Sequence, residues 1–585
     1  MCGIFALLNN SGLISKKKIS NNFGKGSKRG PEMSAYVSLG NLVEMGFHRL
    51  AINGIDSTSG QPMTIDGITL ICNGEIYNYK ELYKIIDTEP KTNSDCEIII
   101  HLYRKHGIEY TLNLLDGVFG FVLYDTREPE LVVHIARDPY GVRPLYILQC
   151  DSASEPVVAL ASELKALHGL TDYNSEIKHV TPGTYSSFIR SDTAHLKLES
   201  GEYWKQSIQE TKYTQLWGST SMVTANPSVT ETWEVHLSIC QHLNNAVKKR
   251  VCGTSDRPIA CLLSGGLDSS LITALVSKYY DGVLETYSIG MEGSKDLINA
   301  KLVAEHLGTK HTQIEMTAED FFAAIPEVIE TIESYDTTTV RASVGNYLIG
   351  KYIAEHSNAK VIFNGDGSDE LTGGYLYFLE SPDDFEFDKE CRRLLKDIHA
   401  FDVLRSDKCI SSHGLEPRTP FLDRTWVQFY MEIPLSIRNP MSSHMLSSYS
   451  KSDEKVAEKY LLRKAFSVIE PELLPSNILW RTKEAFSDGV SGQDKSWFEI
   501  INEKLASIEI LWNRGNVPSE LYDINPATTK EQMYYRGIYE KVYPDTAAIV
   551  PYFWMPRFVD ATDSSARTLS IYSKINKISV KEKNE

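Results

Sequence analysis

The pattern of apolar segments changes once along this 585-residue chain, and that change constrains the fold more than any other feature. Up to about residue 204, short apolar runs alternate with turns rich in Gly, Pro, Asn and Asp, which predicts a largely antiparallel α+β region. From about residue 233, apolar strands alternate with helical segments, which predicts a doubly wound parallel sheet followed by additional helices. We therefore expect domains over 2–204 and 233–570, a Ser/Thr-rich linker over 205–232, and a flexible tail over 571–585.

Within the second region, apolar runs and capping residues place individual elements. We expect a helix over 268–280 and strands over 259–263, 285–289, 311–316 and 360–363. Asp296 is expected to cap a helix over 297–307 that ends at Gly308. Thr317 is expected to open the next helix with a capping box, and the Ser-rich stretch 441–452 to be a surface loop.

The amino-acid composition indicates which kinds of partner this protein can bind. A formal net charge of -17 argues against nucleic acid or an anionic membrane. The nine cysteines include no C-x-x-C pair, so we expect reduced thiols rather than a structural zinc site. No apolar run reaches the roughly 18 to 20 residues of a membrane span, and the first residues do not resemble a signal peptide. We therefore expect a cytoplasmic protein with small-molecule partners.

Cys2 directly follows the first methionine and precedes a small residue, Gly3. Removal of Met1 would give Cys2 a free α-amine, whose reference pKa of about 7.7 to 8.0 suits it to accept the thiol proton. A cysteine at position 2 is by itself more often incidental than catalytic. The catalytic interpretation therefore depends on motifs further along the chain.

Three later motifs supply the groups that a cysteine attacking an amino-acid amide would need. Arg49 can hold a carboxylate through a bidentate pair. Asn73 offers an amide donor, and Gly74 lets a backbone N–H approach a developing oxyanion. Glu75 and Asp95 are carboxylates suited to a substrate amine. Taken singly, a surface ion pair, a hairpin turn and a helix N-cap explain these motifs about as well.

Together the motifs resemble the glutaminase domain of the class II glutamine amidotransferases, over residues 2–204. The resemblance extends to the segments 29–31, 48–50, 60–62, 119–121, 137–145 and 162–165. It implies an N-terminal-nucleophile fold with αββα layers, in which Cys2 attacks the amide and Asn73 and Gly74 stabilise the oxyanion. It also implies a glutamine pocket formed by Arg49, Leu50, Ile52, Asn73, Gly74, Glu75 and Asp95. The chain departs from the family at 28–32, where it reads Lys-Arg-Gly-Pro-Glu instead of His-Arg-Gly-Pro-Asp.

A second chemical signature occupies residues 264–270, which read Ser-Gly-Gly-Leu-Asp-Ser-Ser between an expected strand and helix. Backbone N–H groups and the helix N-terminus would face phosphate oxygens, and Asp268 can hold magnesium. No lysine follows the glycines, so this is not a Walker A loop. A second loop over 364–371 would lie at the same edge of the sheet. The alternatives are a plain turn for the first loop and a solvated acidic turn for the second.

The first loop resembles that of the ATP pyrophosphatases, and the order of the two regions resembles the glutamine-hydrolysing asparagine synthetases across nearly the whole chain. Further matches lie at 335–336, 413–418, 420–423 and 480–489. The resemblance implies catalytic roles for Asp366 and Lys483, Mg²⁺ ligands at Asp268 and Asp369, an aspartate or pyrophosphate pocket with Thr338 and Arg341, and ATP contacts from Leu263, Ser264, Gly265, Gly266, Asp268, Ser269, Ser270, Ile289, Asn364 and Gly365. Asp366 and Asn364 replace a common Glu and Ser of the family, which leaves their individual contributions open.

The implied reaction is ATP-dependent synthesis of asparagine from aspartate and glutamine-derived ammonia, through β-aspartyl-AMP, with release of AMP, pyrophosphate and glutamate. Ammonia would have to cross unprotonated through a sealed, mainly apolar channel, whose residues the sequence leaves open. The oligomeric state is also open, a homodimer included. The alternatives are a β-lactam synthetase-like enzyme, which needs no glutaminase, and a non-catalytic glutamine or nucleotide sensor, which predicts erosion of one site. Intact Cys2, Arg49, Asn73 and Asp95 argue against the first alternative, and the absence of erosion in either set of motifs argues against the second.

Overall fold

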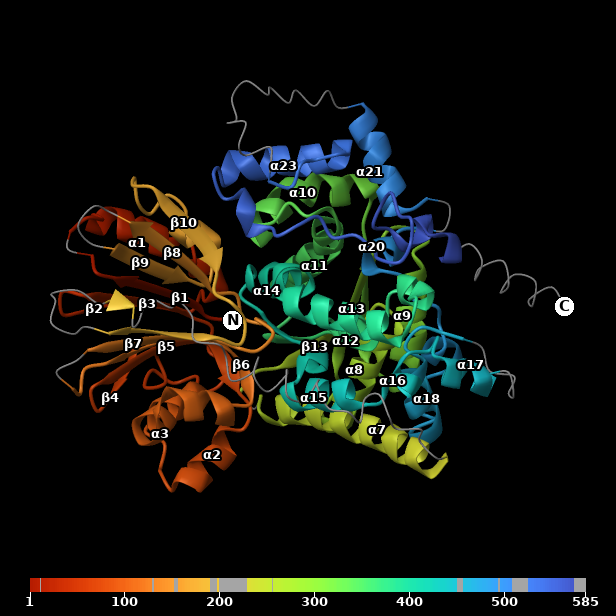
Figure 1. The fold of residues 1–585 in the computed structure, drawn as a ribbon, viewed down its shortest axis with the longest axis horizontal. Helices are drawn as coiled ribbons and strands as arrows, with labels where there is room; N and C mark the ends of the chain where they lie inside the picture. The colour runs from red at the N-terminus through yellow and green to blue at the C-terminus, as the bar shows by residue number, and fades with distance from the viewer. Residues whose placement is uncertain are drawn as a thin grey trace.

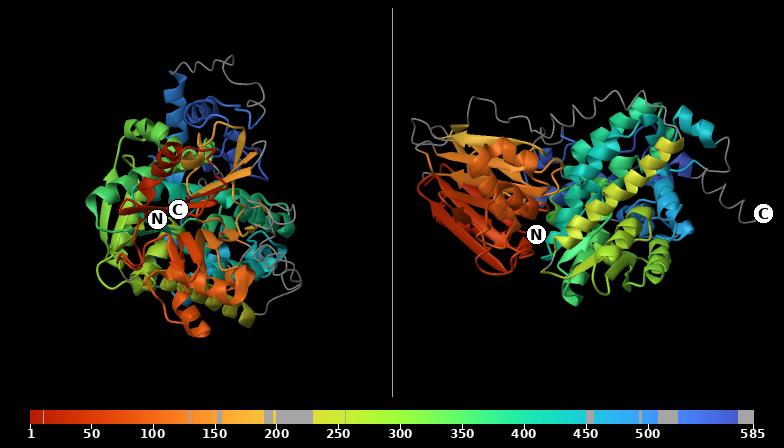
Figure 2. Two further views of the ribbon diagram at one scale, coloured as in Figure 1. Left: turned by 90° about the vertical axis from the view of Figure 1, so that its left-hand side faces the viewer. Right: turned by 90° about the horizontal axis from the view of Figure 1, so that it is seen from below.

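The structure is a computed structural model that describes residues 1–10, 12–128, 131–151, 156–189, 197–198, 229–254, 256–449, 456–492, 495–507 and 524–572. Two lobes lie side by side, and the first contains all the strands up to β12 (Figures 1 and 2). In the described part of the chain, no helix combines the length and hydropathy needed to span a bilayer.

The first lobe is built on two six-stranded antiparallel sheets. Their strand orders are β10-β8-β9-β1-β3-β2 and β12-β11-β7-β6-β5-β4. The first sheet comprises β1 (Gly3–Leu8), β2 (Met33–Leu39), β3 (Val43–Arg49), β8 (Tyr146–Asp151), β9 (Pro156–Ala161) and β10 (Ser175–His179). The second comprises β4 (Met63–Ile65), β5 (Ile68–Ile76), β6 (Gly117–Asp125), β7 (Val132–Arg137), β11 (Tyr185–Ile189) and β12 (Lys197–Leu198).

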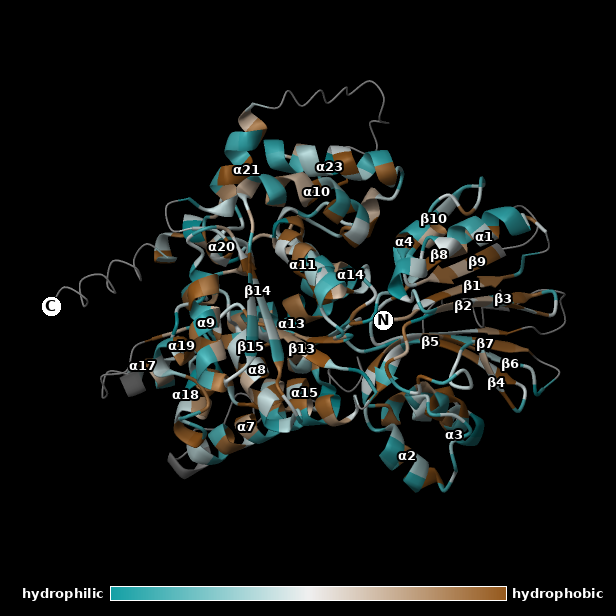
Figure 3. Ribbon diagram, turned by 180° about the vertical axis from the view of Figure 1, so that it is seen from behind, coloured by the Kyte–Doolittle hydropathy of each residue, from teal (hydrophilic) through white to brown (hydrophobic). Residues whose placement is uncertain are grey.

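The sequence of β1 shows why both faces of its sheet are covered. All six of its residues are buried, so the strand is a continuous apolar run instead of an alternating one. Ile4 and Ala6 pack with Ile71 of β5 between the two sheets, whereas Phe5 packs on the opposite face with Ile19 of helix α1 (Lys16–Gly24). The strands accordingly form an apolar band through the lobe (Figure 3).

Three more helices complete this lobe. Helix α4 (Leu164–Leu167) lies with α1 on the first sheet, and helices α2 (Tyr79–Ile86) and α3 (Ile98–Leu114) pack against the second. The side chains that join α2 and α3 to β5 and β6 form one apolar cluster. Because of this support, the carboxyl end of β5 is held in place on one side by helices.

The second lobe contains the predicted parallel sheet. Its order is β15-β14-β13-β16-β17, and every neighbouring pair is parallel. The strands are β13 (Ile259–Leu262), β14 (Glu285–Gly290), β15 (Lys310–Glu315), β16 (Val361–Phe363) and β17 (Glu416–Arg418). From β13 the chain proceeds first to one side and then, at β16, to the other. The carboxyl ends of β13 and β16 therefore open at the switch point where such sheets bind ligands.

Helices cover this sheet and continue beyond it. They are α7 (Val229–Cys252), α8 (Leu267–Tyr279), α9 (Lys295–Leu307), α10 (Ala318–Ile332), α11 (Thr337–His356), α12 (Ser368–Thr372), α13 (Asp384–Asp397), α14 (Asp402–Ser411), α15 (Arg424–Glu432), α16 (Leu435–Arg438), α17 (Ser443–Tyr449), α18 (Tyr460–Ile469), α19 (Ser476–Leu479), α20 (Phe486–Gly489), α21 (Trp497–Ala506) and α23 (Lys530–Val542). Helix α7 runs along one flank of the lobe (Figure 2).

Helix caps confirm one sequence prediction and correct another. Thr317 opens α10 with the predicted capping box, and Gly308 ends α9 in a left-handed conformation. The prediction that Asp296 caps α9 was wrong. Ser294 is the cap, because its side chain accepts from the backbone N–H of Leu297, while Asp296 lies in the first turn.

Three segments that were predicted to be irregular are partly ordered in the structure. Residues 229–232, placed in the linker, belong to α7, while 205–228 lie outside the described residues. The Ser-rich stretch forms α17, because Ser442 caps its first turn by accepting from the Met445 N–H; residues 450–452 are not described. The flexible tail was predicted to begin at residue 571, which is too early. Ile571 is buried, and Tyr572 donates a hydrogen bond to Glu484. Residues 573–585 lie outside the described part of the chain.

Candidate active sites

The N-terminus lies where the first lobe meets the second (Figure 1), and Cys2 directly precedes β1. Its Sγ lies 3.5 Å from the carbonyl oxygen of Leu50. Met1 is fully buried, and its α-ammonium lies 3.7 Å from Glu416 Oε2 and donates to the Leu415 carbonyl at 3.4 Å. Removal from water raises the pKa of the Cys2 thiol to about 11 and lowers the pKa of the Met1 amine to about 6, so little positive charge remains on that amine at neutral pH to oppose the shift of the thiol. With Met1 in place, the thiol is therefore protonated at neutral pH.

Asn73 and Gly74 occupy the carboxyl end of β5. Asn73 is 1% exposed, and neither atom of its side-chain amide has a hydrogen-bond partner within the described structure. An unpartnered buried amide is costly, so its presence indicates a site that a ligand completes. Gly74 has a steric reason to be glycine, because a Cβ there would lie 2.5 Å from the carbonyl oxygen of Val118 in the neighbouring strand.

The remaining glutamine-pocket residues surround this strand end. The Arg49 guanidinium donates to the carbonyls of Asp56, at 2.7 Å, and Gly54, which fixes its orientation while leaving further N–H groups for a carboxylate. Asp95 Oδ2 accepts from the Ile76 N–H at 2.7 Å. Leu50 and Ile52, which come soon after Arg49 in the chain, are both buried.

Both carboxyl groups in this pocket are hard to ionise. Burial raises the pKa of Asp95 to about 6, despite the hydrogen bond from Ile76. Burial, reinforced by the nearby Asp95, also raises the pKa of Glu75 well above its usual range, although Arg418 opposes this shift. An ammonium group pairs most strongly with ionised carboxylates. Its binding would therefore favour the loss of the proton from both carboxyl groups.

The contacts between the lobes beside Cys2 are charged. Arg418 Nη2 lies 3.2 Å from Glu75 Oε1 and 2.9 Å from Glu416 Oε1, and Arg143 Nη2 lies 3.4 Å from the same Glu416 oxygen. All four side chains are buried. The apolar channel expected for ammonia is a separate feature and stays a prediction.

A second site opens at the carboxyl ends of β13, β14 and β16. It is a pocket of about 1290 Å³, its open mouth included. The predicted residues that line it are Leu263, Ser264, Gly266, Asp268, Ser269, Ile289, Thr338, Asn364, Gly365, Asp366, Asp369 and Lys483. The structure thus brings together both loops found in the sequence and the lysine of the 480–489 segment.

Three predicted residues do not line this pocket. Gly265 has a positive φ of 69°, and a Cβ there would lie 2.4 Å from the backbone nitrogen of Ala300, so its role is to let the loop pack on α9. Ser270 is fully buried in α8. The Arg341 guanidinium is taken up by two carboxylates, with Nη2 to Glu531 Oε2 at 2.5 Å and Nη1 to Asp563 Oδ1 at 2.7 Å. In this structure Arg341 therefore anchors the C-terminal segment and is not among the residues that line the pocket.

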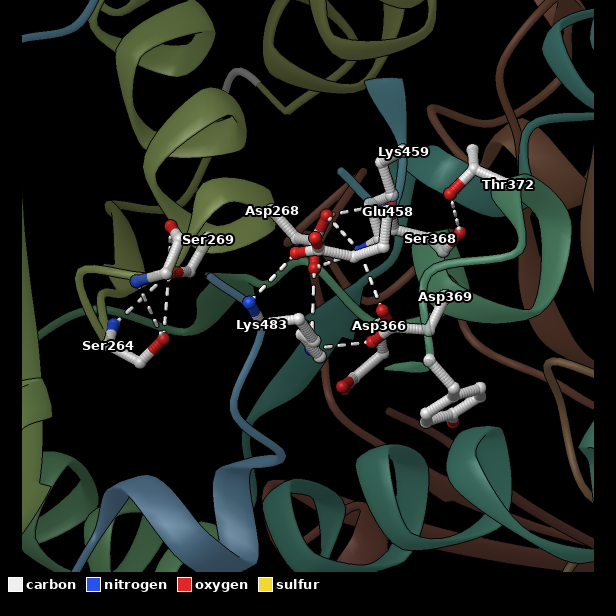
Figure 4. Close-up of polar contacts among 12 residues, drawn as sticks. Ser264, Asp268, Ser269, Asp366, Ser368, Asp369, Thr372, Glu458, Lys459 and Lys483 are labelled. Carbon is white, nitrogen blue, oxygen red and sulfur yellow. Dashed lines mark hydrogen bonds and ion pairs between the residues drawn. The ribbon is translucent and has the colours of Figure 1, made fainter. Parts of the chain in front are cut away.

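Two lysines and two aspartates form a compact cluster at the pocket floor (Figure 4). Lys459 Nζ lies 2.6 Å from both carboxylate oxygens of Asp268 and 2.7 Å from Asp369 Oδ1. Lys483 Nζ lies 2.6 Å from Asp369 Oδ2 and 3.6 Å from Asp268 Oδ2. Burial would raise the pKa of Asp369, but the two lysines hold it well below its usual range.

The sequence interpretation missed Lys459, which no motif marks. Lys459 has a φ of 55°, unusual for a residue with a side chain, at the start of α18. A Cβ at Gly374 would lie only 1.9 Å from Lys459 Cε and 2.3 Å from Asp369 Oδ1. Gly374 therefore leaves room for the lysine, a relation visible only after the chain has folded.

A second missed cluster lies elsewhere in the wall of the same pocket. Arg405 Nη2 lies 3.0 Å from Asp366 Oδ1 and 2.9 Å from Asp402 Oδ1. Tyr375 donates to Glu370, and burial together with Asp402 raises the pKa of Glu370 well above its usual range. Asp366, which was predicted to be catalytic, is therefore already paired with a guanidinium in this structure.

Each region of the chain matches a known domain family. Residues 1–214 match the glutamine amidotransferase domain, and 238–384 together with 379–558 match asparagine synthase. Asparagine synthetase (glutamine-hydrolyzing) from Gallus gallus is 40% identical, over 98% of this chain and 99% of the relative. The enzyme of the same name from Homo sapiens is 38% identical over the same shares of the two chains.

Among solved structures, the NH3-dependent NAD synthetase from Campylobacter jejuni matches 24% of this chain and 60% of its own, with 22% identity and a TM-score of 0.18. That score is too low to support the fold, which rests instead on the strand order of the parallel sheet. The two domain matches span most of the chain, and the relatives align along nearly all of it. The chain therefore belongs to the family of glutamine-hydrolysing asparagine synthetases.

Proposed function

We propose that this chain makes asparagine from aspartate, using ATP and ammonia released from glutamine, with AMP, pyrophosphate and glutamate as the other products. The observation that carries the proposal is that one chain holds a thiol at Cys2, a buried Asn73 amide without a partner in the described structure, and a separate pocket with a lysine–aspartate cluster. We assign the first lobe to the αββα N-terminal-nucleophile class and expect a cytoplasmic enzyme.

In the first half-reaction, the Cys2 thiolate attacks the side-chain amide carbon of glutamine. Removal of Met1 would free an α-amine on Cys2 itself to take the thiol proton, which then passes to the departing ammonia. Asn73 Nδ2 and the Gly74 N–H stabilise the negative oxygen of the tetrahedral intermediate. Arg49 holds the α-carboxylate, and Glu75 and Asp95 hold the α-ammonium. Water then hydrolyses the thioester and releases glutamate.

In the second half-reaction, the aspartate β-carboxylate attacks the α-phosphorus of ATP and pyrophosphate leaves. Ser264, Gly266 and Ser269 face the phosphates from the first loop, while Asn364 and Gly365 contact the nucleotide from the second. Lys459 and Lys483 neutralise the pyrophosphate as it separates. Ammonia then attacks the acyl carbon of β-aspartyl-AMP and AMP departs, with Asp366 available to accept the excess proton.

Asp268 and Asp369 suit Mg²⁺, which usually binds one or two carboxylates together with substrate phosphates. Two carboxylates that share two lysines fit such a site, because phosphates can take over the lysines while the carboxylates turn to the metal. No group of three or more His, Cys, Asp or Glu side chains that could hold a metal occurs in the described residues, so substrate phosphates and water would complete the coordination of such an ion. When bound, the metal would neutralise charge on the phosphates.

A product assay tests the proposal. The purified protein is incubated with glutamine labelled with ¹⁵N at the amide, aspartate and Mg-ATP. We expect labelled asparagine and AMP in equal amounts. Glutamate without AMP would exclude the synthetase assignment, and retention of Met1 in a chain that still hydrolyses glutamine would exclude the proposed nucleophile.

A further inference from the structure

Arg418 touches both sites at once, through different parts of the residue. Its Nη2 lies 3.2 Å from Glu75 Oε1 in the glutamine pocket. Its backbone carbonyl accepts a hydrogen bond from the Asn364 N–H at 3.1 Å, and Asn364 lines the ATP pocket. The residue is 1% exposed, so neither contact is weakened by bulk water.

The side chain of Arg418 would respond to glutamine. Glu75 Oε2 is held by Asn53 Nδ2 at 2.8 Å, which leaves Oε1 facing Arg418. Because Glu75 is hard to ionise in the free protein, an ammonium group bound to it would draw it into its ionised form. The charge that faces Arg418 Nη2 would then change, and with it the balance between Glu75 and Glu416, whose Oε1 lies 2.9 Å from the same nitrogen.

The backbone around Arg418 is attached to the ATP loop at two points. Phe363 pairs with Arg418 in the β16–β17 ladder, and the hydrogen bond to Asn364 extends this pairing into the loop. Four residues later, Leu422 fills the space above Gly367, where a Cβ would lie 2.5 Å from Leu422 Cγ. A displacement of 418–422 therefore moves the base of the loop that carries Asp366 and Asp369.

We propose that Arg418 is a positioning residue that couples the two sites, so that glutamine bound at Glu75 changes how the 364–370 loop holds ATP. The inference rests on the proposed function, because it takes Glu75 as a glutamine ligand. Arg418 contacts neither substrate in this scheme. It acts through Glu75 on one side and through Asn364 on the other.

The test uses Cys2→Ala protein, which should bind glutamine without consuming it. Asparagine synthesis from ammonium is measured with and without saturating glutamine, and the ratio of the two KM values for ATP is the coupling factor. We expect a factor of at least about five, the lower end of typical couplings between sites. In Cys2→Ala/Arg418→Lys and Cys2→Ala/Arg418→Met the factor should fall to about one. Because the ratio is taken within each variant, a general loss of activity cancels.

Arg424 supplies the matched control. It is also an arginine of the second lobe that reaches the first, where its Nη1 donates to the carbonyls of Asn113 and Leu115 at 3.1 and 3.0 Å. It is not among the lining residues of the ATP pocket. Arg424→Lys in the same background should keep the coupling factor of the parent protein.

Linkage provides a second measurement that needs no Arg418 variant. If glutamine changes the affinity for ATP, then a non-hydrolysable ATP analogue must change the Kd for glutamine by the same factor. Calorimetry on Cys2→Ala protein measures this directly. An unchanged glutamine Kd, or an equal factor in the Arg418 variants, overturns the coupling inference. A protein that binds no glutamine, or makes no asparagine from ammonium, would instead refute the proposed function.

Discussion

The two sites are prepared for their ligands in opposite ways. The glutamine pocket is left incomplete, because the Asn73 amide is buried without a partner in the described structure. The ATP pocket is neutralised without a ligand, because Lys459 and Lys483 already pair with Asp268 and Asp369. The first site can receive a neutral amide with little rearrangement. The second must exchange one set of ion pairs for another when a phosphate chain arrives.

The largest effect is expected when the nucleophile of the glutamine site is removed, which tests whether the two sites work separately. Cys2→Ala should reduce glutamine-dependent synthesis by at least about 1000-fold, because the covalent route is lost. Synthesis from ammonium should continue, since the ATP pocket is a separate site. Steady-state assays with each nitrogen source measure both. Loss of both activities would mean that the sites do not work separately.

Lys459→Met should reduce synthesis from either nitrogen source by about 100-fold, since one of the two cations facing the pyrophosphate is lost. Glutamine hydrolysis alone should persist. Lys278→Met is the control, because that lysine pairs with Glu470 on the surface. Equal losses in the two variants would argue against a special role for Lys459.

Gly374→Ala tests whether the close packing of Lys459 and Asp369 against Gly374 fixes the shape of the ATP pocket. The new methyl group would overlap Lys459 and Asp369, so we expect the free energy of unfolding to fall by about 1–3 kcal/mol. The KM for ATP should rise as the lysine is displaced. Gly24→Ala, where a Cβ meets no atom within 4 Å, should leave thermal unfolding nearly unchanged. Similar unfolding midpoints for the two variants would contradict the packing argument.

Glutamine affinity should depend on pH because Asp95 has a pKa of about 6 in the free protein. Below that pH the carboxyl is protonated and cannot pair with an ammonium group, so binding releases a proton. Protonation of Asp95 should therefore raise the Kd for glutamine by about tenfold for each unit that the pH falls below 6, in addition to the contribution of Glu75, whose pKa is also raised. Calorimetry with Cys2→Ala protein between pH 5 and 8 measures this. A flat profile would remove Asp95 from the ammonium site.

The smallest effect is expected at the edge of the ATP pocket. Tyr572 donates to Glu484 at 2.7 Å, next to Lys483. Tyr572→Phe should remove this hydrogen bond, worth about 1 kcal/mol, and raise the KM for ATP by a few-fold at most. Glutamine hydrolysis is the internal control, because it should not change.

Local patterns in the sequence predicted the parts of the molecule that neighbouring residues determine. The parallel sheet was predicted from strands alternating with helices, and the two nucleotide loops from glycines at strand ends. The glutamine-pocket candidates came from short motifs, and the structure places Asn73, Glu75 and Asp95 around one strand end.

The features that the sequence did not predict depend on contacts between distant segments. Lys459 pairs with Asp268, which lies 191 positions away in the sequence. Nothing in the sequence around Lys459 indicates that it belongs to the ATP pocket. Arg341 was expected in the substrate pocket, but Glu531, 190 residues away, takes up its guanidinium. Asp296 was expected to be a cap because it begins an apolar run, yet its carboxylate pairs with Arg481 and leaves the cap to Ser294.

The C-terminal segment holds the loop that carries Lys483 in place. Ser565 Oγ donates to Asp488 Oδ1 at 2.7 Å, and Arg567 donates to the Asp488 carbonyl at 2.8 Å. During synthesis on the ribosome, these residues emerge after both nucleotide loops and after Lys483. A nascent polypeptide therefore cannot finish its nucleotide pocket until the chain has been made through Arg567, although the strands of its first lobe were made long before.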